Sequence, residues 1–220
     1  MTDFPAFDLV LGTDTGVGKT IVSAFLIRNA AGEGKFPAYM KPALTGGSPV
    51  APDSDPVRCA VLSGVPELPV ECLYVFSEPI DPMTAASRAG RSIDPSRIRR
   101  EIRDRASSTT LIVEGAGGVL SPFFSDGGGI LSAFTAEDLQ NVRVHLVSHL
   151  HLGALAQVLI AIRFLNEIPV LPTLHLVRRP GFDPYPLASS LNPDTLRTLL
   201  PNLRIILHDS PVEAFGGSTG

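Results

Sequence analysis

The segment GTDTGVGKT, at residues 12–20, combines residue types that can bind a phosphate chain. Glycines let the backbone turn its N–H groups inward, a lysine can reach β- and γ-phosphates, and a threonine hydroxyl is a ligand for Mg²⁺. The common P-loop has four residues between its first glycine and the Gly-Lys-[Ser/Thr] ending. Five residues separate Gly12 from Gly18 in this chain. We therefore predict a phosphate-binding loop with a longer backbone path, in which Lys19 and Thr20 are the reactive groups and Asp14 caps backbone N–H groups.

Further charged groups stand at the ends of apolar runs or in the loops that follow them. Lys41 and Thr45 follow the apolar run of FPAYMKPALTGG, Asp55 lies in the Pro-rich loop with Asp53, and Glu114 ends the run LIVE. The Gly-Ala-Gly-Gly after Glu114 allows a ligand to approach the backbone closely. An acid at the end of a buried strand is the usual second carboxylate on the metal side of a P-loop protein. We predict one site with two lysines and a Mg²⁺ held by Thr20, Asp55 and Glu114.

The elements that must position these groups alternate along the chain. Apolar, β-branched runs predict strands, and apolar residues at helical spacing predict helices. The strands are expected at 7–12, 36–42, 109–115, 142–148, 168–177 and 203–208, and the helices at 19–34 and 152–167. Glycine and proline predict loops at 46–56 and 180–186. The alternation favours an α/β fold, a single-domain P-loop NTPase over residues 1–220 with a mostly parallel sheet covered by helices on both faces.

Composition narrows the class of partner. The chain has 220 residues, 44% hydrophobic and 18% charged, with a net charge of −4 and no basic stripe. We expect a globular protein whose partners are small molecules, with neither nucleic acid nor a membrane among them. The N-terminus lacks the pattern of a signal peptide, and no apolar run approaches about 20 residues. Cys59 and Cys72 fit no metal-ligand spacing, so we expect free thiols and a cytoplasmic location.

The motifs GTDTGVGKT, KPALTGG, SDP and VEGAGG, in this order and spacing, resemble the dethiobiotin synthetase family over roughly residues 7–155. The longer phosphate loop is that family's own variant. The resemblance implies an ATP- and Mg²⁺-dependent ligase that closes a ring from 7,8-diaminononanoate (diaminopelargonate) and CO₂ in biotin biosynthesis. It also implies a homodimer in which the second subunit holds part of the substrate.

The resemblance assigns roles to residues that match its motifs. Lys41, with Lys19, is expected to be catalytic beside the carbamate, and Thr45 to contact the substrate. Thr20, Asp55 and Glu114 match the Mg²⁺ ligands. The start of a helix near Gly153 is expected to hold the substrate carboxylate through its free N–H groups. The expected nucleotide contacts are Gly16, Val17, Gly18, Lys19, Thr20, Ile21, Asp55, Glu114, Gly115, Ala116 and Gly117.

The last third of the chain departs from the family pattern. His149 and His151 stand near Gly153 and are interpreted as polar loop residues. Arg178 and Arg179 occupy the neighbourhood in which many members carry an Asn-Asp pair that reads adenine. We therefore expect broader nucleotide selectivity than in those members.

Two alternatives remain at the level of the sequence. One is a partitioning-type ATPase switch, although Asp14 stands where that group usually has a second lysine. The other is a sibling ligase that activates a different carboxylate, although such enzymes usually carry an added glutaminase domain.

Overall fold

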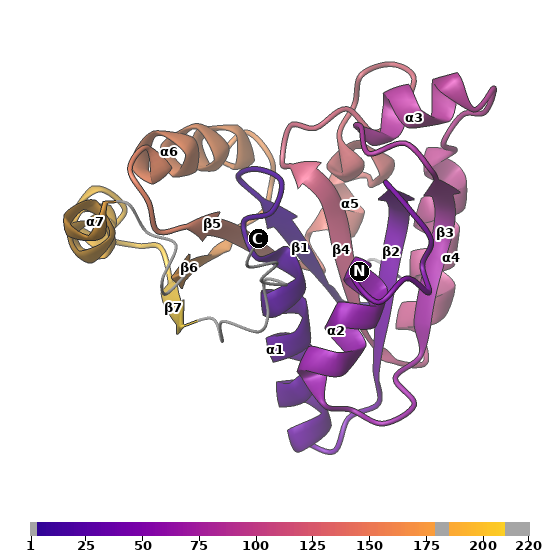
Figure 1. Cartoon of the computed structure of the whole chain (residues 1–220), viewed down its shortest axis with the longest axis horizontal. Helices are drawn as coiled ribbons and strands as arrows, with labels where there is room; N and C mark the ends of the chain where they lie inside the picture. Colours follow the sequence, from indigo (N-terminus) through magenta and orange to yellow (C-terminus); the bar gives the residue numbers. More distant parts are fainter. Residues whose placement is uncertain (1–3, 179–184, 210–220) are drawn as a thin grey trace, which may run out of the picture.

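The computed structural model describes residues 4–178 and 185–209, and these form one seven-stranded sheet in the order β3-β2-β4-β1-β5-β6-β7 (Figure 1). Neighbouring strands pair in parallel throughout. The strands are β1 (Phe7–Gly12), β2 (Pro37–Thr45), β3 (Val70–Phe76), β4 (Thr110–Gly118), β5 (Val142–His149), β6 (Thr173–Arg178) and β7 (Ile205–Asp209). The predicted α/β class with a parallel sheet is confirmed.

Helices cover both faces of this sheet (Figure 1). They are α1 (Lys19–Gly32), α2 (Asp55–Ser63), α3 (Pro82–Arg88), α4 (Pro95–Ala106), the 3₁₀ turn η1 (Ile130–Ala133), α5 (Ala136–Leu139), α6 (Ala154–Leu165) and α7 (Pro186–Leu199). On one face, Val22 and Ile27 of α1 pack with Val10 of β1. On the other face, Ile98 of α4 and Val158 of α6 join the larger core with Leu9 and its neighbours. Since both faces of β1 are buried, its sequence is a continuous apolar run rather than an alternating one.

Several predicted boundaries need correction. β2 continues beyond residue 42 to Thr45, and β4 continues to Gly118, so the predicted ligands Thr45 and Gly117 lie on strands. The predicted loop 46–56 ends at Ser54, because Asp55 and Pro56 begin α2. The strand predicted at 168–177 begins only at Thr173. Of the predicted loop 180–186, residues 180–184 lie outside the described part, and Pro186 begins α7.

A chain of hydrogen-bonded polar side chains runs across four adjacent strands. Asp8 of β1 lies 2.9 Å from His145 Nε2 on β5, and His145 Nδ1 lies 2.9 Å from His175 Nε2 on β6. His175 Nδ1 lies 2.8 Å from His208 Nε2 on β7. Asp8 also accepts two hydrogen bonds from Arg143, at 2.8 and 2.7 Å. These hydrogen-bonded side chains link β1, at the centre of the sheet, to the edge strand β7.

Two further expectations concern membrane-spanning helices and the cysteines. Within the described residues, no helix is long and apolar enough to cross a membrane. Cys59 is buried and Cys72 half-buried, and both are free thiols, as expected.

Candidate nucleotide-binding and catalytic site

The loop at residues 12–20 connects β1 to α1 at the carboxyl edge of the sheet. Gly16 and Gly18 have φ angles of 69° and 102°, which glycine adopts without strain. Lys19 Nζ donates to the carbonyls of Asp14, at 3.0 Å, and Gly117, at 2.7 Å, so its side chain crosses from the loop to β4. Asp14 accepts from the N–H of Thr15 at 2.6 Å, the local capping predicted for it. Burial, and then the charge of Lys41, lower the pKa of Lys19 to about 8.

Lys41 lies between two carboxylates at the centre of the site. Its Nζ is 2.8 Å from Glu114 Oε1 and 2.7 Å from Asp55 Oδ2, and it donates to the carbonyl of Gly115 at 3.2 Å. Lys41 and Glu114 are 3% and 1% exposed. Burial opposes the charge of Lys41, but the attraction of Glu114 and Asp55 prevails and raises its pKa. Against the same opposition from burial, Lys41 lowers the pKa of Asp55 to about 2. Lys41 and Asp55 are therefore both ionised at neutral pH.

The oxygen atoms beside Lys41 fit a hard cation such as Mg²⁺. Thr20 Oγ1 lies 2.9 Å from Asp55 Oδ1 and 3.2 Å from Glu114 Oε1, so a hydroxyl and two carboxylates converge. Ser23, which the sequence analysis missed, donates to Glu114 Oε2 at 2.9 Å and fixes the carboxylate. Mg²⁺ binds through one or two carboxylates and keeps several waters, so this donor set suffices. The described residues contain no group of three or more His, Cys, Asp or Glu that could hold a metal.

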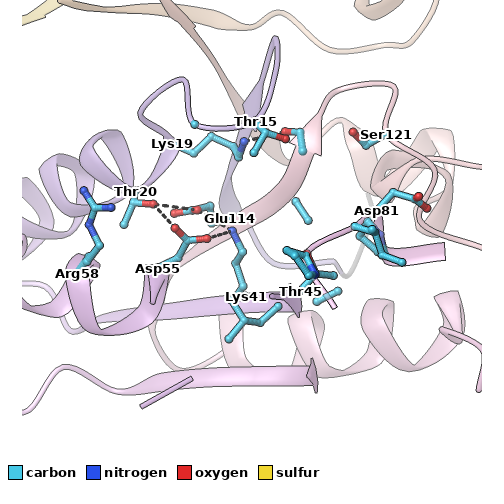
Figure 2. Close-up of a pocket in the computed structure, with 18 of the residues that line it drawn as sticks. Thr15, Lys19, Thr20, Lys41, Thr45, Asp55, Arg58, Asp81, Glu114 and Ser121 are labelled. Atoms are coloured by element: carbon cyan, nitrogen blue, oxygen red, sulfur yellow. Dashed lines mark hydrogen bonds and ion pairs between the residues drawn. The ribbon is translucent and has the colours of Figure 1, made fainter. Parts of the chain in front are cut away.

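These groups line a cavity of about 720 Å³ (Figure 2). The cavity extends from the loop across the ends of β2 and β4 to the segment before α3. The predicted residues on its wall are Gly16, Gly18, Lys19, Thr20, Ile21, Lys41, Thr45, Asp55, Glu114, Ala116 and Gly117. Three other predicted residues are not on its wall. Val17 is fully buried in the core, Gly115 faces Leu11 and Ile130, and Gly153 caps α6.

A family model described as an AAA domain matches residues 9–174. The chain belongs to this AAA domain family.

Relatives of this AAA domain protein confirm the resemblance stated from the motifs. Over 116 residues it is 43% identical to ATP-dependent dethiobiotin synthetase BioD of Anaeromyxobacter sp. (strain K), with 51% of each chain covered. It is 41% identical over 122 residues to BioD of Mycobacteroides abscessus, with 54% of this chain and 51% of the relative covered. The chain spans about half the length of the curated relatives it matches.

Solved structures confirm the P-loop NTPase fold of the AAA domain. A ParA family ATPase from Chlorobium tepidum has a TM-score of 0.57 at 13% identity, covering 94% of this chain and 86% of its own. FlhF, solved with GMPPNP and Mg²⁺, has a TM-score of 0.53 at 11% identity, covering 94% of this chain and 67% of its own. At these identities the likeness concerns the fold alone.

The cavity of the AAA domain also contains residues that sequence reasoning missed. Arg58 lies one turn after Asp55 on α2, a helix start that was interpreted as part of a loop. Asp81 caps α3 by accepting from Thr84 N–H at 2.8 Å, and Ser121 Oγ accepts from Gly118 N–H at 2.8 Å. The pair DP at the start of α2 is a helix-start signal that could have placed Arg58.

A second hollow of about 340 Å³ lies on the other side of the phosphate loop. Thr13 and Asp14 form one wall, residues 118–121 another, and Gln157, Ile160 and Ala161 of α6 the third. Gly153 precedes α6 with a φ of 93° but lines neither hollow.

The remaining polar residues singled out from the sequence lie away from the main cavity. The interpretation of His149 as a loop residue was wrong, because His149 is the last residue of β5; its ring centroid is 5.3 Å from that of His151. Arg178 forms an ion pair with Asp209 at 3.4 Å, and Arg179 lies outside the described residues. The AAA domain therefore gathers most of the motif residues around the main cavity, whereas His149 and His151 do not line it.

Proposed function

We propose that this protein is an ATP- and Mg²⁺-dependent dethiobiotin synthetase. It would close a ring from 7,8-diaminononanoate and CO₂ and release dethiobiotin, ADP and phosphate. The observation that carries the proposal is the buried, charged Lys41 beside the phosphate loop, paired with Asp55 and Glu114 in a cavity that extends beyond them. The names of the relatives that match half of the chain support the same reaction.

The proposed reaction has three steps. One amine of the substrate attacks CO₂, forms a C–N bond and loses a proton to give a carbamate. A carbamate oxygen then attacks the γ-phosphorus of ATP, and the bond from that phosphorus to the ADP oxygen breaks. The second amine attacks the carbamate carbon, phosphate leaves with the C–O bond, and the amine proton is lost as the cyclic urea closes.

The two lysines would reduce the repulsion between the carbamate anion and the phosphate chain. A carbamate anion must approach a phosphate chain, and two unit charges 4 Å apart repel by about 4 kcal/mol at an effective dielectric constant near 20. Lys41, held charged by its carboxylates, would orient the carbamate, and Lys19 would reach the transferring phosphate. Thr20, Asp55 and Glu114 would hold Mg²⁺, which supplies further neutralisation of phosphate charge.

The far part of the cavity suits the aliphatic chain of the proposed substrate. Beyond Lys41 the wall includes Leu44, Pro79 and Ile80, with the hydroxyl of Thr45 among them. Apolar surface there would bind methylene groups, and Thr45 would offer a hydrogen bond to a polar end.

A homodimer belongs to the same proposal. Leu120 and Ile160 border the second hollow and are 53% and 59% exposed, so an apolar surface adjoins the phosphate loop. A partner subunit docked there would bring the free N–H groups of its own α6, after Gly153, towards the substrate carboxylate. Sedimentation velocity measures the oligomeric state, and a monomer at micromolar concentration would contradict this part.

The deciding experiment is a synthesis assay. Purified protein is mixed with diaminopelargonate, bicarbonate, Mg²⁺ and ATP, and dethiobiotin is measured by mass spectrometry. Parallel reactions with CTP and GTP test the expected broad nucleotide selectivity, which strong preference for ATP would contradict. Absence of dethiobiotin with every nucleotide would defeat the proposed function.

A further inference from the structure

Arg58 is a third cation on the wall of the main cavity, and the motifs do not account for it. It lies on α2 three residues after Asp55, and its side chain is half-buried. Figure 2 shows it on the Thr20 side of Asp55, away from Lys41. Residues three apart on a helix share a face, so Arg58 and Asp55 are presented to the cavity together.

The position of Arg58 is well fixed by its helix. Its own N–H donates to the carbonyl of Ser54 at 2.9 Å in the first turn of α2. At the other end of α2, Arg28 of α1 donates to the carbonyls of Leu62 and Ser63, the latter at 3.2 Å. α2 is therefore tied to α1, the helix that follows the phosphate loop, and Arg58 is held beside Thr20 by rigid elements rather than by a loop.

The other two cations of the cavity have partners, whereas the guanidinium of Arg58 has no ion pair or hydrogen bond within the described residues. Lys41 contacts two carboxylates, and Lys19 contacts two carbonyls. Many arginines away from the cavity pair with acids, for example Arg99 with Asp138 and Arg143 with Asp8. A guanidinium kept half-buried and unpaired in a cavity is available to an anionic ligand, and its planar fork matches phosphate oxygens.

The charges around the cavity point to the same ligand. Its charged residues in the described part are Lys19, Lys41, Arg58, Asp55, Asp81 and Glu114, three of each sign. Without Arg58 the wall would be net negative and would repel a polyanion before any metal bound. Arg58 thus brings the formal charge of the charged side chains on the wall to zero.

We propose that Arg58 binds the phosphate chain of the Mg²⁺-nucleotide beyond its α-phosphate, on the side of the metal ligands opposite Lys41. The inference rests on the proposed function only in taking this cavity as the nucleotide site. An arginine supplied by the same chain can stabilise charge on a transferring phosphoryl group in P-loop proteins. Here it would stand one helical turn from Asp55, and Lys19 would contact the same phosphates from the other side.

The test measures nucleotide affinity directly, by isothermal titration calorimetry with Mg-ATP and with AMP. Arg58→Ala is expected to raise the Kd for Mg-ATP about tenfold, as for loss of a charge-assisted pair, and the Kd for AMP less than twofold. Arg58→Lys keeps a point charge, so its Kd for Mg-ATP should lie between those of the wild type and Arg58→Ala. Arg100→Ala is the matched control because it removes one positive charge from an exposed arginine paired with Glu101. It should bind both nucleotides as the wild type does.

The possible results separate the role of Arg58 from the proposed reaction. An unchanged Kd for Mg-ATP in Arg58→Ala, or an equal loss for Mg-ATP and AMP, overturns the proposal. Circular dichroism reports folding, and if Arg58→Ala is unfolded, Arg58→Lys carries the comparison. The Arg58 effect without dethiobiotin synthesis would defeat the proposed reaction and leave this inference standing. Dethiobiotin synthesis without the Arg58 effect would do the reverse, and a wild type that binds no Mg-ATP would defeat both.

Discussion

At the scale of the residue, Lys41 has two tasks that compete for the same atoms. Its ammonium contacts Asp55 and Glu114, which are also the proposed Mg²⁺ ligands. When Mg²⁺ binds beside Thr20, it compensates part of the negative charge of the two carboxylates. Their attraction for Lys41 is then weaker. Lys41 would then be free to orient an anionic substrate, and its ion pairs with Asp55 and Glu114 keep it charged.

The variant Lys41→Met tests this arrangement because it keeps the volume of the side chain and removes the charge. The two carboxylates would face each other without a cation, and loss of one member of a buried ion pair costs about 3 kcal/mol. We expect the free energy of unfolding in EDTA to fall by about this amount, and saturating Mg²⁺ to restore more stability to the variant than to the wild type. Urea titrations with and without Mg²⁺ measure both effects.

The same variant should lose turnover at least 100-fold in the synthesis assay while nucleotide binding stays largely intact. Lys35→Met is the control, because Lys35 is exposed and pairs with Glu33 on the surface. It should change stability by less than about 0.5 kcal/mol and leave turnover unaltered. An equal response of wild type and Lys41→Met to Mg²⁺ would show that Lys41 does not compensate the metal ligands.

At the scale of the element, two glycines near the end of α1 look equivalent in the sequence but differ in backbone conformation. Gly32 is the last helical residue, and a Cβ added there would meet nothing within 4 Å. Gly34 has equally open surroundings but a φ of 72°. Space is therefore the same at both positions, and only the backbone conformation separates them.

Replacing each glycine by alanine should move the stability of the protein in opposite directions. Gly32→Ala is expected to raise the free energy of unfolding by about 0.5–1 kcal/mol, because alanine loses less conformational entropy in a helix. Gly34→Ala is expected to lower it by about 1 kcal/mol, because an L-residue is strained at positive φ. Chemical denaturation of the two variants side by side measures the difference, and shifts of the same sign would refute the argument.

Elements with strong local signals were predictable from the sequence, and the site followed from them. β1, α1 and β4 are long apolar runs or periodic segments, and the motif residues at their ends meet in one cavity. β3 was missed although its last five residues form the apolar run CLYVF; it is an edge strand, and the run follows the exposed Val70 and the half-buried Glu71. α2 was missed because serine, aspartate and proline were interpreted as loop residues, although they also form helix starts. Arg58 was not identified as a site residue because it lies on that helix.

The polar chain across the sheet depends on long-range register and could not be read from local patterns. Asp8, His145, His175 and His208 come from four separate strands, and only the order β1-β5-β6-β7 brings them together. Each imidazole in the chain can donate from one ring nitrogen and accept at the other, so the neutral forms satisfy one another. Phe25 of α1 closes the outer end, with its ring centroid 4.9 Å from that of His208.

At the scale of the whole molecule, the row of hydrogen-bonded side chains from Asp8 to His208 makes the stability of the fold depend on pH. Burial, and then the neighbouring His145, His208 and Arg204, lower the pKa of His175 to about 2. Burial also lowers the pKa of His208, although Asp209 opposes the shift. In the unfolded chain a histidine binds its proton near pH 6.5. Below that pH the unfolded state therefore takes up protons that the folded state refuses, so stability is fully present above pH 6.5 and falls as the pH drops towards 2.

The prediction is a loss of unfolding free energy between pH 6.5 and 4.5 that approaches about 1.4 kcal/mol per pH unit for His175 alone. Asp8 does not contribute to the slope between pH 6.5 and 4.5. Against the opposing effect of burial, hydrogen bonds from His145 and Arg143 hold its pKa below the ordinary value of 3.8, so its carboxylate stays ionised over this range. Urea denaturation at several pH values should give a shallower slope for His175→Asn than for the wild type, by about one proton. His151→Asn, which removes a half-buried histidine that does not belong to this row of hydrogen-bonded side chains, should keep the wild-type slope. An unchanged slope in His175→Asn would mean that His175 takes up its proton in the folded state. The linked strands would then tolerate a charge at the position that binds β6 to β5 and β7.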